Sequence, residues 1–285
     1  MKFGIITPVF DGCFESIKLL YENLQSQTFD NWIWLLCSNS YSEKYAEFVK
    51  TKNAQLKQPK LVYVCTNECD PKNHFSLIAN IGKRRNLCIK RVNCDYVGMI
   101  DADAKIIDNT MFETLIQEIR TMPKQVILYR IKIDDGTLPQ FPISIGKIDL
   151  LNFFVKTELA KRIGYPSTVG FYQSPNDFNF FVKAYNKSKG EVLFLSKIFC
   201  EYNGNNCYKN IGKILLEQKK QPKQKDYIKY CLSYLLYCLN ERYLIGLLKV
   251  AHDSLFYYHI LPKRIIAQRN VYFKKPILKT KERKS

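Results

Sequence analysis

The sequence lacks the features that mark several classes of protein. Its 285 residues include 3 His, and its 10 Cys form no C-x-x-C pair, so a zinc site is not expected. Residues 1–10 lack the basic segment, long apolar run and cleavage site of a signal peptide. In the apolar segment Tyr227 to Ile260 the longest uncharged run is 11 residues, against about 20 for a membrane span. We therefore expect a cytoplasmic protein with reduced, buried thiols.

Acidic residues are also scarce, and the resulting charge is uneven. The chain has 44 Lys and Arg against 26 Asp and Glu, a net charge of +18. Residues 209–285 contain 18 Lys and Arg and 5 Asp and Glu, and so carry +13 of that charge. Such a basic stretch predicts an anionic partner. No aromatic RNP block or zinc finger is present, so no specific nucleic acid is expected. A basic nucleic-acid- or membrane-binding protein on a degenerate catalytic fold stays an alternative.

Short apolar runs alternate with helical spacings along the first 121 residues. Residues 3–9, 32–37, 61–65 and 96–100 predict strands, and residues 15–27, 42–56, 80–92 and 110–120 predict helices. This alternation favours a parallel, doubly wound α/β sheet, which binds ligands beyond the carboxyl ends of its strands. Further along the chain the pattern is looser, with strands predicted at 126–133 and 192–199 and helices at 157–163 and 176–186.

Two carboxylates follow the fourth apolar run, in the sequence Asp101-Ala102-Asp103. Side chains alternate along a strand, so the two would point the same way, into the ligand crevice. Such oxygen ligands suit Mg²⁺ or Mn²⁺, which typically takes one or two protein carboxylates together with phosphate oxygens. A solvated turn after the strand is the alternative.

Two further segments suit an anionic substrate or a proton transfer. Residues 82–86, Gly-Lys-Arg-Arg-Asn, lie in a predicted helix. The planar guanidinium groups of the arginines, together with a helix terminus, would bind phosphate. The alternative is a solvated basic helix face. Asn176-Asp177 opens another predicted helix, and Asp177 is a candidate general base. The alternative there, compatible with the first, is helix capping by Ser174 or Asn176.

Several blocks occur in an order that resembles a known enzyme family. The blocks are Ile5-Ile6-Thr7-Pro8-Val9-Phe10, Gln27-Thr28-Phe29-Asp30-Asn31-Trp32, Arg85-Asn86, Asp95-Tyr96 leading into Asp101-Ala102-Asp103, and Asn176-Asp177. Together they resemble the family-2 type of inverting glycosyltransferases with the GT-A fold, most strongly over residues 3–104. The resemblance implies a mixed, mostly parallel sheet flanked by helices. We expect a catalytic domain over residues 1–217, and the polar, basic segment from residue 218 and the apolar and basic pattern after it predict a helical, basic C-terminal extension over residues 218–285.

The resemblance implies a role for each matching residue. The residues implied to line the site for the base, ribose and diphosphate are Thr7, Pro8, Phe10, Arg85 and Asp101. Asp103 would ligate Mn²⁺ or Mg²⁺ between the two phosphates. Asp177 would remove the proton from an acceptor hydroxyl, which then displaces the nucleoside diphosphate from the anomeric carbon with inversion.

The sequence departs from the family pattern at three places. Cys37-Ser38-Asn39-Ser40 stands where the family usually has Asp-Asp-Gly-Ser. Ser38 or Asn39 would hydrogen-bond a base without negative charge, so the identity of the base stays open with UDP favoured. Asn176 replaces the usual Glu beside the catalytic Asp. The segment Cys200 to Gly204 lacks the metal-ligating His of many relatives. Asp149 lies in the region that varies in this family to recognise the acceptor, and it is a second candidate for the general base.

The C-terminal segment bears on location and acceptor. An apolar stripe over residues 232–247 and the Lys- and Arg-rich end 263–284 predict a basic amphipathic element on an anionic membrane surface. Packing of these helices on the catalytic domain is the alternative. We expect a nucleotide-sugar donor and a glycan or lipid-linked acceptor, at the cytoplasmic face of a membrane. The product would be cell-surface polysaccharide, lipopolysaccharide or a glycoprotein glycan. A nucleotidyltransferase is the competing enzyme class.

Overall fold

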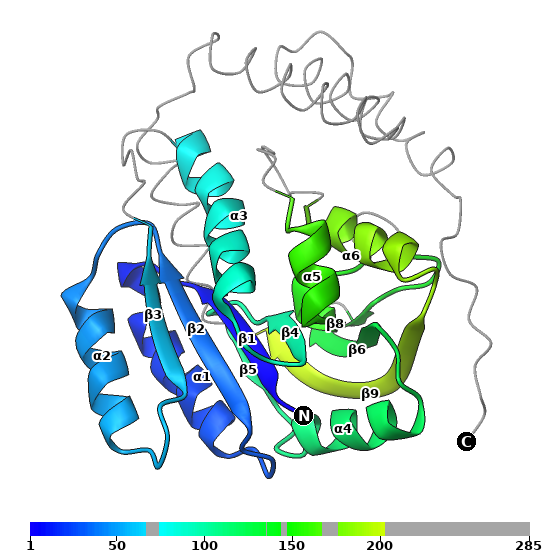
Figure 1. Ribbon diagram of the computed structural model, residues 1–285, viewed down its shortest axis with the longest axis horizontal. Coiled ribbons are helices and arrows are strands. Elements are labelled where there is room, and N and C mark those ends of the chain that lie inside the picture. The colour runs from blue at the N-terminus through cyan, green and yellow to red at the C-terminus, as the bar shows by residue number, and fades with distance from the viewer. Residues whose placement is uncertain (67–73, 135, 144–146, 167–175, 203–285) are drawn as a thin grey trace, which may run out of the picture.

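The structure is a computed structural model that describes residues 1–66, 74–134, 136–143, 147–166 and 176–202 (Figure 1). The predicted C-terminal extension and its boundary at residue 217 lie outside these ranges, as does the candidate capping residue Ser174. Within them, no helix is both long enough and apolar enough to cross a bilayer.

Nine strands and six α-helices make up the described fold. The strands are β1 (Phe3–Pro8), β2 (Trp32–Ser38), β3 (Leu61–Cys65), β4 (Tyr96–Met99), β5 (Ala104–Ile106), β6 (Val126–Ile133), β7 (Gly136–Leu138), β8 (Phe153–Lys156) and β9 (Val192–Tyr202). The helices are α1 (Phe14–Gln25), α2 (Glu43–Ala54), α3 (His74–Arg91), α4 (Met111–Thr121), α5 (Thr157–Ile163) and α6 (Asn176–Lys187). All six predicted strands and six predicted helices are present, with boundaries shifted by a few residues.

The strands form one mixed sheet in the order β3-β2-β1-β4-β8-β6-β9-β5, with β7 paired to β6. The first four strands are parallel, as the alternation of strands and helices predicts. Beyond β4 the direction changes, because β8 runs antiparallel to both β4 and β6. The mixed α/β fold class is thus confirmed. The short strands β5, β7 and β8 had no sequence signal, since three or four residues are too few to show a period.

Two layers of helices cover the sheet (Figure 1). One face packs on α1, α2 and α4 through a core that includes Phe3, Trp34 and Phe112. The other face packs on α3, α5 and α6 through Ile6, Leu35 and Phe181. Neighbouring strand residues enter opposite cores because side chains alternate along a strand. Both faces of the central strands are therefore buried, and only the strand ends are left to build a site.

Gly98 lets a large aromatic ring lie directly against the sheet. A Cβ at this position in β4 would come 2.5 Å from the ring of Phe154 on the adjoining strand β8. Phe154 is fully buried and packs against Phe3, Phe112 and Tyr129, so the ring has no space into which it could move. Glycine is required here by the close approach of the ring.

We expect Gly98→Ala to lower the free energy of unfolding by about 1–3 kcal/mol through overpacking. In a Phe154→Leu background the same change should cost less, because the smaller side chain leaves room for the methyl group. Urea denaturation of the four proteins measures both effects. Additive costs would show that the contact between Gly98 and Phe154 is not the constraint.

Candidate active site

The carboxyl ends of the four parallel strands meet at one edge of the sheet (Figure 1). Parallel strands place their ends together, and this is the edge at which such sheets bind ligands. The predicted site residues at these ends are Thr7 and Pro8 at the end of β1 and Phe10 just after it, Ser38 at the end of β2 with Asn39 following, and Asp101 and Asp103 after β4. The structure therefore brings together residues that lie up to 96 positions apart (103 minus 7) in the sequence.

Thr7 ties three parallel strands together just below this edge. Its hydroxyl donates to the carbonyl oxygen of Ile100 at 2.6 Å and accepts from Nε1 of Trp34 at 2.8 Å. Both Thr7 and Trp34 are fully buried. The contact holds Ile100, and with it the start of the Asp101–Asp103 segment, against β1. The sequence signal for Thr7 thus marks a structural link as well as a place beside the predicted nucleotide pocket.

Pro8 and Phe10 shape the loop that follows β1. Pro8 is buried at the strand end, and Phe10 is partly buried against the α1–α2 side of the core. The Phe10 carbonyl accepts a hydrogen bond from the hydroxyl of Tyr45 on α2 at 2.6 Å. This contact fixes the course of the loop at the mouth of the site.

Ser38 is held inside the protein by hydrogen bonds of its own. Its hydroxyl lies 2.6 Å from the carbonyl oxygen of Ser40 and 2.7 Å from the hydroxyl of Tyr63 on β3. Ser38 is 3% exposed, whereas Asn39 is partly exposed. Of the two residues predicted to read the base, Asn39 is thus the more accessible, and Ser38 serves to order the loop.

Asp101 and Asp103 lie in a turn and not on a strand, which corrects the geometry expected from strand alternation. β4 ends at Met99, and the amide of Ala104 donates to the carbonyl of Asp101 at 3.0 Å. The turn leaves Asp101 partly exposed and Asp103 only 6% exposed. Burial, with the nearby Asp101 carboxylate second, raises the pKa of Asp103 to about 7.

Arg85 is buried on α3, which contradicts the reading of residues 82–86 as a solvated basic face. Arg84 and Arg85 are 5% and 6% exposed, whereas Lys83 is exposed. Arg85 also lies in the second half of α3, so the helix N-terminus does not contribute as expected. Its Nη2 donates to Oδ1 of Asp101 at 2.7 Å, which joins α3 to the end of β4.

Asp177 stands in the first turn of α6, as predicted. Its Oδ1 accepts a hydrogen bond at 2.9 Å from the hydroxyl of Tyr165, a residue that the sequence analysis did not single out. Burial is the main cause that raises the pKa of Asp177 to about 7, and the charge of Asp149 adds to it. Arg85 and the Tyr165 hydrogen bond act in the opposite direction.

Asp149, the second base candidate, has a structural task. Its Oδ1 accepts from the amide of Leu151 at 2.9 Å, and its amide donates to Oδ1 of Asn152 at 2.8 Å, which closes a capping box on a short 3-10 helix. Burial raises its pKa, and a hydrogen bond from Tyr202 on β9 lowers it. Asp149 is therefore engaged on two sides, while it still contributes negative charge to the site.

Four carboxylates at this edge lie close enough to affect one another, and Arg85 is paired with one of them, Asp101. They are Asp101, Asp103, Asp149 and Asp177, and each of the last three has a raised pKa to which another member of the set contributes. Oδ1 of Asp103 is buried without a hydrogen-bond partner among the described residues. Such an orphaned carboxylate oxygen fits a cation ligand, because a buried polar atom without a partner is costly. No group of three metal-ligating side chains occurs among the described residues.

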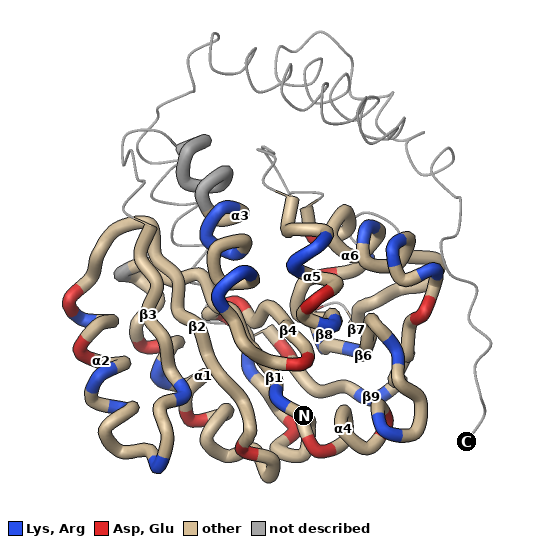
Figure 2. The backbone as a smooth tube through the Cα atoms, in the orientation of Figure 1, with Lys and Arg blue, Asp and Glu red and all other residues tan. Residues whose placement is uncertain are grey.

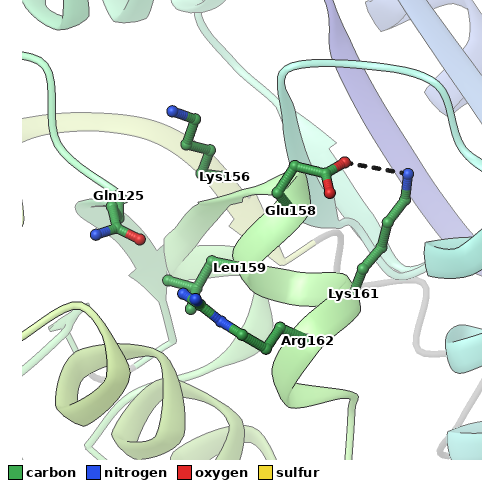
Figure 3. A pocket seen from close by; sticks show the side chains of 6 residues that line it. All are labelled: Gln125, Lys156, Glu158, Leu159, Lys161 and Arg162. Carbon is green, nitrogen blue, oxygen red and sulfur yellow. Dashed lines mark hydrogen bonds and ion pairs between the residues drawn. The ribbon is translucent and has the colours of Figure 1, made fainter.

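A second hollow lies elsewhere on the surface and does not extend this site. Gln125, Lys156, Glu158, Leu159, Lys161 and Arg162 line it (Figure 3). Lys156 on β8 pairs with Tyr96 at the start of β4, so the hollow opens at the opposite end of that strand from Asp101. Glu158 already forms an ion pair with Lys161 at 3.3 Å.

Basic side chains occur on all three helices of the α3 face. Figure 2 shows Lys and Arg on α3, α5 and α6. Most of them are exposed, whereas Arg84 and Arg85 on α3 are buried. The positive charge that reaches into the site therefore comes from α3.

Comparisons with solved structures identify the fold. A structure of S. aureus TarS aligns with a TM-score of 0.56 and 19% identity, over 80% of this chain and 69% of that one. A mannosyltransferase from Pyrobaculum calidifontis, PcManGT, aligns with a TM-score of 0.54 and 12% identity, over 96% of this chain and 81% of that one. The fold is of the GT-A type. No protein-family model and no curated protein sequence matches the chain.

These GT-A structures also show what the neighbours bind. TarS has been solved with UDP-GlcNAc and with UDP, and the mannosyltransferase with GDP-Man and Mn²⁺. The present chain covers 42% of the length of the longer TarS structure. At these identities the likeness establishes the fold, and the activity has to be argued from the site.

The link through Thr7 can be tested by removing its hydroxyl. We expect Thr7→Val to lower the free energy of unfolding by about 1–3 kcal/mol, because the buried Trp34 indole loses its acceptor. In a Trp34→Phe background the same change should cost less, since no indole donor is left unpaired. Urea denaturation measures the four proteins, and an equal cost in both backgrounds would show that the Trp34 hydrogen bond does not contribute.

Proposed function

We propose that this protein is an inverting glycosyltransferase that moves a sugar from a nucleotide-sugar donor to a hydroxyl group. The observation that carries the proposal is that Arg85 joins Asp101 to Asp177, directly on one side and through Tyr165 on the other, at the ligand-binding edge of a GT-A sheet, with Asp103 beside Asp101. The similarity to glycosyltransferase structures with UDP-GlcNAc and GDP-Man supports the same class of substrate.

The donor side is assigned to the end of β4 and to α3. Asp103 would hold Mn²⁺ or Mg²⁺ through its orphaned oxygen, with phosphate oxygens of the donor completing the shell. The bound ion would stabilise negative charge on the departing diphosphate. Arg85, already paired with Asp101, adds a fixed positive charge beside the same phosphates. Phe10 and Asn39 would border the space for the base and ribose, with the buried Thr7 and Pro8 behind them, and UDP stays the favoured nucleotide.

The acceptor side is assigned to Asp177. Its carboxylate would take the proton from the acceptor hydroxyl as the oxygen attacks the anomeric carbon, on the face opposite the leaving nucleoside diphosphate. Its raised pKa of about 7 suits a general base at neutral pH. Asp149 stays the second candidate, although it is already bound within its capping box.

The identity of the acceptor and the location of the enzyme rest on the basic tail. A charge of +13 over residues 209–285 would draw the enzyme to an anionic membrane surface, at the cytoplasmic face. There it would meet a glycan or lipid-linked acceptor. Specific nucleic-acid binding is not part of this proposal.

The donor assignment is tested by calorimetric titration of UDP, GDP and CDP with and without Mn²⁺. We expect one nucleoside diphosphate to bind in a metal-dependent way. Asp103→Asn should lower its affinity at least about tenfold, or about 1.4 kcal/mol, because the cation loses a charged ligand. Asp30→Asn is the matched control, since the Asp30 carboxylate is 87% exposed before β2. Equal, metal-independent binding by wild type and Asp103→Asn would contradict the assignment.

The base assignment is tested by the pH dependence of transfer. We expect kcat to rise with pH and to level off above about pH 7, because Asp177 accepts a proton only when it is ionised. Asp177→Asn should lower kcat by about 10²–10⁴-fold and remove this limb. Release of nucleoside diphosphate from the sugar nucleotide measures the rate. Release of pyrophosphate would instead identify a nucleotidyltransferase.

The same variant should not be less stable than wild type. A folded-state pKa above the ordinary value of 3.8 means that ionisation of Asp177 destabilises the fold as pH rises from about 4 through about 7. Asp177→Asn removes that cost, so its Tm at pH 8 should equal or exceed that of wild type. Full activity in Asp177→Asn would transfer the role of base to Asp149.

A further inference from the structure

Tyr165 occupies a fixed place between the two halves of the site. It follows Gly164 at the end of α5 and is 4% exposed. Its backbone amide donates to Oδ1 of Asn86 at 2.6 Å, and Nδ2 of Asn86 donates to its carbonyl at 2.8 Å. The Arg85 guanidinium lies 4.9 Å from the centre of its ring. Consecutive residues of α3 therefore hold both the backbone and the ring of Tyr165.

Gly164 allows the backbone turn that places Tyr165 against α3. Its φ of +63° lies in the left-handed region that favours glycine. A Cβ there would come within 3.4 Å of Oδ1 of Asn86, the atom that receives the Tyr165 amide. The turn after α5 thus brings Tyr165 back against α3.

The hydroxyl of Tyr165 connects the donor side to the base. It accepts a hydrogen bond from Nη1 of Arg85 at 3.0 Å and donates one to Oδ1 of Asp177 at 2.9 Å. When Asp177 is ionised the polarity is fixed, because a guanidinium only donates and a carboxylate only accepts. Arg85 in turn donates to Asp101. An unbroken hydrogen-bonded series, Asp101–Arg85–Tyr165–Asp177, therefore runs from the end of β4 to the start of α6.

We propose that Tyr165 is a positioning residue that fixes the carboxylate of Asp177 and couples it to the Asp101–Arg85 pair. This inference rests on the proposed function, in which Asp177 is the base and Arg85 faces the donor diphosphate. A phosphate that approaches Arg85 competes for its donor groups, and the change reaches Asp177 through a single hydroxyl. Donor binding and base orientation are thereby linked.

The electrostatic setting makes the hydroxyl's effect measurable. Among the described residues, the charged and titratable groups that act on Asp177 are Asp149, Asp101, Arg85, Tyr165 and Tyr202. Burial and then the charge of Asp177 raise the pKa of Tyr165 well above its ordinary value, so it remains an O–H donor. Its hydrogen bond lowers the pKa of Asp177. Loss of the hydroxyl should therefore raise that pKa and move the ascending limb of a pH profile to higher pH.

The test is NMR of the protein labelled with ¹³C at the aspartate side-chain carboxyl, which needs no turnover. The Asp177 signal is assigned by its loss in Asp177→Asn and titrated in wild type, in Tyr165→Phe and in Tyr96→Phe. Tyr96→Phe is the matched control, because it removes a partly buried tyrosine hydroxyl that donates a hydrogen bond elsewhere, to the carbonyl of Lys124 at 2.6 Å. We expect a higher pKa for Asp177 in Tyr165→Phe alone.

The coupling is tested by adding UDP or GDP with Mn²⁺ to the same samples. The Asp177 signal should shift in wild type and in Tyr96→Phe, and shift less in Tyr165→Phe. With a sugar nucleotide, Tyr165→Phe should lower kcat about tenfold or more with little change in KM, and its pH limb should move upward.

The outcomes separate this inference from the proposed function. An Asp177 titration that is identical in wild type and Tyr165→Phe would overturn the positioning role, whatever the enzyme's activity. A shifted titration without any transfer activity would support the contact and contradict the proposed function. If Tyr165→Phe is unstable, the wild-type response of the Asp177 signal to nucleotide and Mn²⁺ decides, and its absence would overturn the coupling.

Discussion

The site depends on one buried guanidinium. Arg85 enters the edge of the sheet from α3 and is 6% exposed. A buried arginine is costly unless charges and hydrogen bonds compensate it, and here the Asp101 carboxylate and the Tyr165 hydroxyl do so. In return, the guanidinium pairs with Asp101 and lowers the pKa of Asp149 and Asp177, which offsets part of the repulsion among these carboxylates. Without the guanidinium, these negative charges would repel one another strongly, because the dielectric constant is low where they are buried.

This arrangement explains why stability and function oppose each other at this edge. The pKa values of Asp103 and Asp177 are both raised to about 7 by burial, so their ionised forms weaken the fold. Proteins keep such groups where chemistry requires them. The scaffold below compensates, because Thr7 and Trp34 lock β1, β2 and β4 through fully buried side chains.

The sequence was sufficient for the long elements and for most residue positions in the site. Apolar runs of five or more residues marked β1, β2, β3 and β6, and the order of motifs placed Asp101, Asp103 and Asp177 at strand or helix ends. The geometry could not be predicted in the same way. The turn at Asp101–Ala104 replaces the strand alternation expected there, and the burial of Arg85 depends on the tertiary contact with Asp101.

Tyr165 was missed for a similar reason. It follows a seven-residue helix, which is too short for a clear hydrophobic period to single it out. Its contacts come from α3, about 80 residues earlier in the chain. Gly164 before it was the one local signal. Ser38 is the opposite case. The sequence suggested that it recognises the base, but its hydroxyl is already hydrogen-bonded to Tyr63 and to the carbonyl of Ser40. Its hydroxyl orders the loop, so in the proposed donor site the choice of base would fall to neighbours such as Asn39.

The central claim is that Asp103 and Arg85 bind a metal–diphosphate group. The most direct measurement is a crystal structure with UDP or GDP and Mn²⁺, using anomalous scattering to locate the metal. The account predicts one strong Mn²⁺ peak within coordination distance of Asp103, with the diphosphate between that ion and Arg85. A metal bound away from Asp103, or a nucleotide bound at another edge of the sheet, would contradict it.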